Sequence, residues 1–146
     1  MIEYLRGWPL SFEQSYEEKR EAIVVRTREI LKSSKNAIFA LHRGDMDRAV
    51  LLLDKARNAS AELAPMVEEE PSLRFGAYAS CMEEYGEARA FEHFLRHGSL
   101  IPKSELPLCD RTEYLCGICD FTGRIRKRQN ANLVVLGVGL FVCFAP

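Results

Sequence analysis

The sequence lacks an excess of charge of either sign. Its 146 residues carry 20 Lys and Arg against 21 Asp and Glu, a net charge of −1, so no overall positive field attracts it to nucleic acid. A nucleic-acid partner would need a local basic patch. The N-terminal segment also lacks a basic stretch followed by an apolar run, which argues against a secretory signal. With 47% apolar side chains, the chain predicts one compact soluble domain, and we expect it in the cytoplasm.

The spacing of the cysteines supports neither a disulfide framework nor a zinc site. The five cysteines are an odd number and are scattered along the chain. Cys116 and Cys119 form a C-x-x-C pair, and no second pair follows at zinc spacing. We therefore predict reduced thiols that act as small buried hydrophobic residues.

Strand patterns are nearly absent, whereas helical periodicity runs through most of the chain. Apolar residues recur at seven-residue intervals within 11–43, as in a long amphipathic helix. Gly44 and Asp45 are suited to end this helix and to cap the next one. The predicted fold is an all-α, antiparallel helical bundle. The further helices are expected at 45–65, where Pro65 should end the helix, at 72–96 and at 110–129.

The predicted helix at 72–96 carries two glutamates that are the main candidates for a functional site. Glu84 and Glu87 lie about 60° apart on a helical wheel, and apolar residues cover most of the remaining surface. The two carboxylates should therefore be partly buried and should need a partner. Two interpretations remain open. Either they face a wet groove or pair with arginines of a neighbouring helix, or they bind a hard cation such as Mg²⁺.

Two sequence blocks carry a family resemblance. Residues 84–88 read EYGEA and are followed by FEHF at 91–94 and SLI at 99–101. The second block, residues 114–123, reads YLCGICDFTG. In their composition, order and separation these blocks resemble the translin/Trax family, and they are most similar to its Trax branch. The resemblance extends over roughly residues 18–128.

The resemblance implies a helical bundle of the translin type that assembles into a hollow homo-octameric shell. It also implies binding of single-stranded or short duplex RNA, with single-stranded DNA as a further partner, and in the Trax branch cleavage of RNA with Mg²⁺ or Mn²⁺. The positions that match the family's acidic catalytic and metal-binding residues are Glu84, Glu87 and Asp120. A fourth position departs from the pattern, because Arg124 stands where the family has Glu.

Arg124 changes what the resemblance predicts. A guanidinium in place of a carboxylate removes one metal ligand and adds a repulsive charge, so cation binding should weaken. Asp120 and Arg124 also occupy positions i and i+4 of a predicted helix, where they can form an ordinary surface ion pair. Arg124 can instead hold a phosphate group.

The basic segment 124–128 is the candidate nucleic-acid contact. Clustered cations suit phosphate groups, but they equally suit the C-terminal end of a helix through its dipole. No aromatic residues are interleaved with them, so the sequence does not support sequence-specific readout. The charged members are Arg124, Arg126, Lys127 and Arg128.

The last residues differ in composition from the rest of the chain. Residues 133–146 have no polar side chain, yet this stretch is shorter than the ~20 residues that a membrane helix needs. We predict a translin-like helical domain at 1–130 and an apolar tail at 131–146. The change in composition indicates a truncated or frame-shifted end, so that the last helices of the family would be missing.

Nucleic-acid binding is the function that the sequence predicts, and whether the chain is an enzyme stays open. One form of the prediction adds Mg²⁺-dependent endoribonuclease activity through the carboxylates. A second form is a binding subunit without catalysis, which Arg124 favours. The alternative from a different class is a helical oligomerisation or interaction protein whose acidic residues only keep it in solution.

Overall fold

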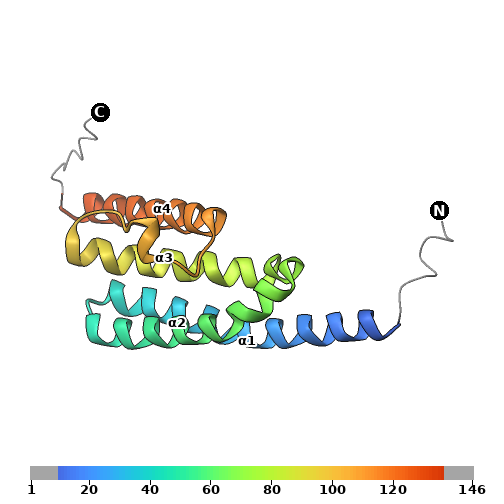
Figure 1. The fold of residues 1–146 in the computed structure, drawn as a ribbon. Coiled ribbons are helices and arrows are strands. Elements are labelled where there is room, and N and C mark those ends of the chain that lie inside the picture. The colour runs from blue at the N-terminus through green and yellow to red at the C-terminus, as the bar shows by residue number, and fades with distance from the viewer. Residues whose placement is uncertain (1–9, 137–146) are drawn as a thin grey trace.

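Residues 10–136 form four long helices joined by short connections (Figure 1). The computed structural model describes the backbone of residues 10–136 and the side chains of residues 16–126. These residues contain helices and turns and no strand, so the all-α prediction is confirmed. The helices are α1 (Leu10–His42), α2 (Met46–Glu69), α3 (Ala77–His97) and α4 (Arg111–Leu136), with 3₁₀ turns η2 (Pro71–Arg74) and η3 (Lys103–Glu105).

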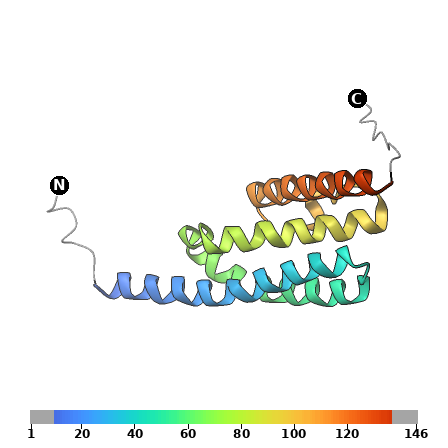
Figure 2. The ribbon, with the colours of Figure 1, turned by 180° about the vertical axis from the view of Figure 1, so that it is seen from behind.

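The helices are arranged in layers. Helices α1 and α2 pair as an antiparallel hairpin, α3 runs alongside this hairpin, and α4 packs on the side of α3 that faces away from the hairpin (Figure 1). The view from behind shows the same order (Figure 2). The first turns of α1, drawn in blue, extend beyond the other helices. Helix α3 is therefore the central element, in contact with both α1 and α4.

The turn between α1 and α2 follows the sequence prediction. Gly44 has a positive φ of +78°, a conformation that glycine adopts without a Cβ clash. The Asp45 side chain accepts a hydrogen bond from the Arg48 backbone N–H at 3.2 Å and so caps α2.

The prediction that α2 stops at Pro65 is wrong, because the helix continues to Glu69. A proline within a helix removes one backbone hydrogen bond. Leu63 and Val67 lie on either side of it and are both buried, so burial of the apolar stripe holds the last turns in place. Glu68 and Glu69, beyond the predicted end, accordingly belong to the helix.

The start of α3 also differs from the prediction. Residues 72–74 form part of the 3₁₀ turn η2, and α3 begins only at Ala77. Gly76 has a φ of +73°, which is incompatible with a right-handed helix and separates the two elements. The predicted end is confirmed, since Gly98 has a φ of +68° and donates its N–H to the Phe94 carbonyl.

Helix α4 begins as predicted and runs further. The Glu113 N–H donates to Asp110 Oδ1 at 2.8 Å, and the Asp110 N–H donates to Glu113 Oε2 at 2.7 Å, which is a reciprocal capping box. The helix continues past the predicted end at 129 to Leu136. Most of the predicted apolar tail, from 137 onward, lies outside the described residues. Within the described helices, no segment has the length and apolar character of a membrane span.

The core lies between α1, α2 and α3 and extends to the connection before α4 and to Phe121 of α4. Burial confirms the prediction of small hydrophobic thiols for Cys81 and Cys109. The prediction is wrong for Cys119, which is exposed, and Cys116 is half-buried; both are free thiols. Cys143 lies outside the described residues. The largest fully buried apolar side chains include Tyr78, Phe91, Ile30, Ile38, Leu41 and Leu53.

Candidate functional site

The candidate site depends on a close approach between α3 and α4. A Cβ atom on Gly117 of α4 would lie 2.8 Å from the Glu87 backbone nitrogen and 2.9 Å from the Glu83 carbonyl oxygen. Only glycine allows this approach, and Gly86 of α3 lies against it. Residues seven apart share one helix face, so the contact at Gly117 also turns Arg124 toward α3. The second sequence block is thereby brought beside the first.

Glu87 is the buried member of the acidic cluster, with 2% of its surface exposed. Both of its carboxylate oxygens accept hydrogen bonds from Arg124. Nε donates to Oε1, and Nη2 donates to Oε2 at 3.1 Å. This bidentate hydrogen bonding raises the pKa of Arg124. Of the two interpretations of the glutamates, pairing with an arginine of a neighbouring helix is the one that the structure shows for Glu87.

Glu84 is half-buried and lines a cavity of about 280 Å³ between α1, α3 and α4. The other lining residues are Lys35, Ile38 and Phe39 of α1 and Arg124 of α4. Burial raises the pKa of Glu84, and the neighbouring charge of Glu87 raises it further, while Lys35 and Arg124 oppose the change. The predicted partial burial of Glu84 and Glu87 is therefore confirmed.

Asp120 lies at the edge of the same cluster. It is exposed, and its charge influences the pKa of both Glu84 and Arg124. The surface ion pair that spacing alone allows between Asp120 and Arg124 does not occur among the described side chains. Arg124 reaches across to Glu87 instead, because a buried carboxylate gains more from a cation than an exposed one does.

The cluster as it lies does not fit a divalent cation. Mg²⁺ needs oxygen ligands with free lone pairs in an octahedral arrangement. Arg124 occupies both oxygens of Glu87, and Asp120 stands apart at the surface. In the part of the chain that the structure describes, no three His, Cys, Asp or Glu side chains are placed to hold a metal ion. Binding of Mg²⁺ by Glu84, Glu87 and Asp120 stays a prediction.

The basic segment divides between the interior and the surface. Arg124 is half-buried against Glu87, whereas Arg126 is exposed. Lys127 and Arg128 belong to α4, and their side chains lie outside the described ones. The segment is thus a row of cations on one helix, and the first of them, Arg124, already forms hydrogen bonds with Glu87.

Sequence reasoning missed the contribution of α1. Lys35 and Phe39 lie one helical turn apart and form a wall of the cavity opposite Glu84. Phe39 is 57% exposed, although it follows the buried Ile38. The sequence feature that could have indicated this wall is Phe39 itself, a large aromatic residue beside the apolar stripe of an amphipathic helix. Its position opposite α3 could not be inferred without the packing of α1 on α3.

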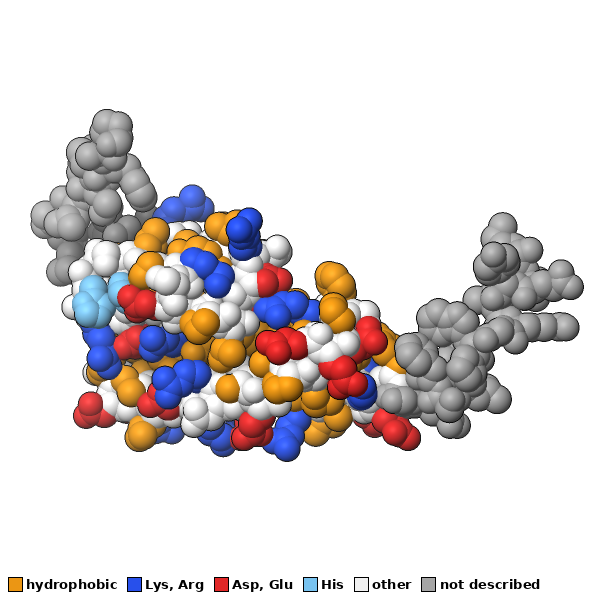
Figure 3. Space-filling model, in the orientation of Figure 1, with side chains coloured by type: hydrophobic (Ala, Val, Ile, Leu, Met, Phe, Trp, Pro, Cys, Tyr) orange, Lys and Arg blue, Asp and Glu red, His pale blue; other side chains and the backbone are white. Residues whose placement is uncertain are grey.

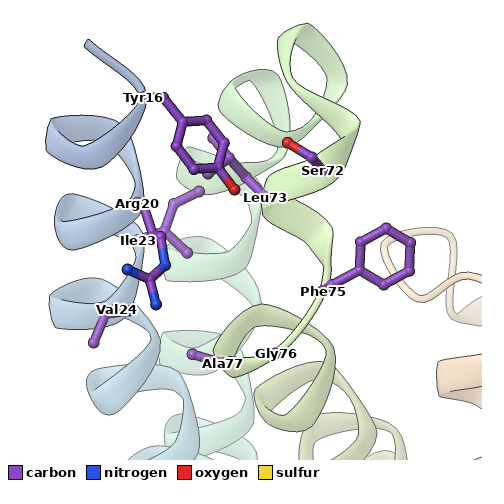
Figure 4. Close-up of a pocket in the computed structure, with 9 residues that line it drawn as sticks. All are labelled: Tyr16, Arg20, Ile23, Val24, Ser72, Leu73, Phe75, Gly76 and Ala77. Atoms are coloured by element: carbon purple, nitrogen blue, oxygen red, sulfur yellow. The ribbon is translucent and has the colours of Figure 1, made fainter. Parts of the chain in front are cut away.

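A second, smaller cavity of about 160 Å³ lies between α1 and the connection from α2 to α3 (Figure 4). Tyr16 and Leu73 approach each other across it, whereas the Phe75 ring points away from α1. Its cation, Arg20, already pairs with Glu17 at 3.1 Å. None of the predicted site residues lies here, so the α3–α4 cluster remains the candidate site.

Comparison with known proteins agrees with the two sequence blocks. Residues 18–129 match the Translin family. The chain belongs to this family. This translin-family chain is 29% identical to the Translin-associated protein X homolog of Schizosaccharomyces pombe, in a match that covers 80% of the chain and 57% of the yeast protein. It is 33% identical to Translin-associated protein X of Rattus norvegicus, in a match that covers 66% of the chain and 37% of the rat protein.

The fold comparison leads to the same family. The crystal structure of apo-NeC3PO matches this translin-family chain with a TM-score of 0.75 and 27% sequence identity. The match covers 85% of this chain and 66% of that one. The chain therefore has the helical arrangement of that structure, and it spans about 57% and 37% of the lengths of the two curated relatives.

Proposed function

We propose that this translin-family chain binds RNA, single-stranded or as a short duplex, with single-stranded DNA as a second ligand, and that it does not cleave them with Mg²⁺. Membership of a family of nucleic-acid-binding proteins supports the binding. We infer the absence of cleavage from the hydrogen bonds that Arg124 donates to both carboxylate oxygens of Glu87. A carboxylate paired in this way is not available to a cation or to a water nucleophile.

The expected contact surface is the basic part of α4. The face of the molecule in Figure 3 mixes acidic and basic side chains, in keeping with a net charge of −1. Binding must therefore come from a local set of cations rather than from a general positive field. Because Glu87 holds Arg124, the proposed phosphate contacts are Arg126, Lys127 and Arg128.

Retention of a labelled single-stranded RNA at increasing salt concentrations tests the binding. On a single strand, each phosphate contact contributes roughly −0.7 to the slope of log K against log salt. Arg126→Ala should make the slope less steep by about one contact. Arg26→Ala serves as a matched control, because Arg26 is an exposed arginine on α1 that pairs with Glu62 at 3.1 Å. Failure of the wild-type protein to bind RNA at low salt would refute the proposal.

A cleavage assay separates this function from the endoribonuclease that the family resemblance implies. Labelled RNA is incubated with the protein and Mg²⁺ or Mn²⁺, beside a Glu84→Ala, Glu87→Ala double variant. We expect the RNA to remain intact in both reactions. Cation-dependent cleavage by the wild type that the double variant lacks would establish the nuclease and overturn the absence of catalysis.

We further propose that the chain acts as a homo-oligomer, for which the family resemblance implies an octamer. An apolar cavity of about 680 Å³ at the end of α3 and the middle of α4 supports a contact between copies; Phe94, Leu100, Phe121 and Ile125 are among its lining residues. Leu100→Asp should dissociate the assembly, as measured by light scattering. Leu51→Asp, on the exposed face of α2, is the control. A monomeric wild type at all concentrations would contradict this part.

A further inference from the structure

We propose that the guanidinium of Arg124 is a built-in substitute for a divalent cation, which closes the carboxylate cluster of α3 and α4 to metal ions. The assignment deepens the proposed function, because it gives a reason why the chain would bind RNA without cutting it. It also predicts that one substitution converts the cluster into a cation site.

The first support is the distribution of charge. Glu84 and Glu87 lie on α3, Asp120 lies on α4, and the charges of all three act on Arg124. Glu87 is almost completely buried, and a buried carboxylate without a positive partner is strongly destabilising. The hydrogen bonds from Arg124 to its two oxygens supply that partner from within the chain.

The second support is the setting of the guanidinium. Among the described contacts, the hydrogen bonds of Arg124 go to Glu87, and no backbone carbonyl shares them. Arg124 also lines the cavity of about 280 Å³ that Glu84 and Lys35 border. Loss of the guanidinium would thus leave two carboxylates of α3 beside a space that water can enter: Glu84, which lines the cavity, and Glu87, whose oxygens Arg124 now occupies. These are the conditions that a hydrated Mg²⁺ or Mn²⁺ ion requires.

The third support is the register of α4. Position 124 is one turn beyond Asp120 and two turns beyond the Gly117 contact, so it faces α3 beside Glu87. A carboxylate at this position would point toward the same acidic group. Arg124→Glu therefore removes the internal cation and adds an oxygen ligand in a single step.

The test measures cation binding by calorimetry and the melting temperature with and without Mn²⁺. Arg124→Glu should lower the melting temperature in EDTA and recover it in Mn²⁺, with saturable binding at least tenfold tighter than that of the wild type. Arg111→Glu is the matched control, because it makes the same change of charge at an exposed position of the same helix, outside the proposed RNA contacts. It should bind Mn²⁺ no better than the wild type does. Arg124→Gln removes the cation without adding a carboxylate, so its Mn²⁺ response should be weaker than that of Arg124→Glu and stronger than that of the wild type. This variant provides the test if Arg124→Glu does not fold.

Two results would overturn the proposal. One is an equal Mn²⁺ response from the wild type and from folded Arg124→Glu or Arg124→Gln. The other is unchanged Mn²⁺ binding when Glu87→Gln is added to Arg124→Glu. RNA retention by the wild type in EDTA is measured separately, so failure of RNA binding and failure of the cation site are distinguishable.

Discussion

Two buried glutamates of this protein, Glu113 and Glu87, each pair with an arginine, yet their surroundings differ. Glu113 is 1% exposed and accepts from Arg74 Nη2 at 2.6 Å, while Glu87 is 2% exposed and accepts from Arg124 Nη2 at 3.1 Å. Both carboxylates escape the cost of an unpaired buried charge. Burial and an ion pair alone therefore do not distinguish a functional site from a structural one.

The difference lies in what else the arginine and the carboxylate contact. Arg74 also donates to the Leu108 carbonyl at 3.1 Å and to Asp110 at 3.2 Å, and it stacks over the Tyr78 ring. Glu113 completes the capping box of α4. This pair joins the end of η2 to the connection before α4 and to the first turn of α4. The Glu87 pair instead borders a cavity and lies near two further carboxylates, Glu84 and Asp120. This site therefore has empty volume and negative charge beyond what the ion pair itself needs.

The largest expected effect contrasts the two arginines. Arg74→Ala should destabilise the protein by about 3–5 kcal/mol, since it leaves Glu113 buried without its cation and removes the contacts to Leu108 and Asp110. Arg124→Ala should cost only about 1–3 kcal/mol, because water from the cavity can solvate Glu87. Chemical denaturation measures both, with Arg126→Ala as an exposed control. A greater loss for Arg124→Ala than for Arg74→Ala would contradict the contrast.

An intermediate effect is expected at the contact that assembles the Glu87 cluster. Gly117→Ala places a methyl group 2.8 Å from a backbone atom of α3, which neither helix can relieve by rotating a side chain. Overpacking of this kind typically costs about 1–3 kcal/mol. Gly123→Ala on the same helix meets nothing within 4 Å and should be neutral or stabilising by up to about 1 kcal/mol. Equal melting temperatures for the two variants would show that the helices are not in backbone contact.

The smallest effect concerns pH, and the two regions should respond with opposite signs. Burial raises the pKa of Glu84 above its ordinary value of 4.5. Between pH 4.5 and this raised pKa the folded state binds more protons than the unfolded state, so the stability falls as the pH rises through this range. Glu84→Gln should therefore have a higher melting temperature than the wild type at pH 7. The difference should disappear below about pH 4.5.

At Asp110, burial acts to raise the pKa, but the Glu113 backbone N–H and Arg74 outweigh it and lower the pKa below 3.8. Its contribution to stability is thus present above pH 3.8 and is lost as the pH falls through the folded-state pKa. Asp110→Asn should lower the melting temperature at pH 7 and matter least in strong acid. If Glu84→Gln and Asp110→Asn changed the melting temperature at pH 7 in the same direction, the two regions would not differ in their response to pH.

Local sequence signals predicted the helices well where a residue acts through its own backbone. Gly44 and Asp45 end and cap helices as expected, because glycine conformation and side-chain capping involve only neighbouring residues. The signals failed at Pro65, where burial of the flanking residues outweighs one lost hydrogen bond. They also missed Gly76, whose positive φ delays the start of α3.

The sequence predicted which residues form the candidate site better than it predicted which of them contact one another. The motifs identified Glu84, Glu87, Asp120 and Arg124, and the helical wheel indicated that the two glutamates are partly buried. The partner of Glu87 could not be predicted, since spacing along α4 allowed Arg124 to pair with Asp120 equally well. The walls from Lys35 and Phe39 were missed because they come from a helix about fifty residues earlier in the chain.

By itself the sequence determined the helical class, the family and the acidic residues, because periodicity, capping and motifs are properties of short stretches of chain. Only the tertiary structure decided which cation neutralises Glu87. That choice depends on the close approach of α3 and α4 at Gly117 and on the higher cost of leaving a buried carboxylate, rather than an exposed one, without a partner.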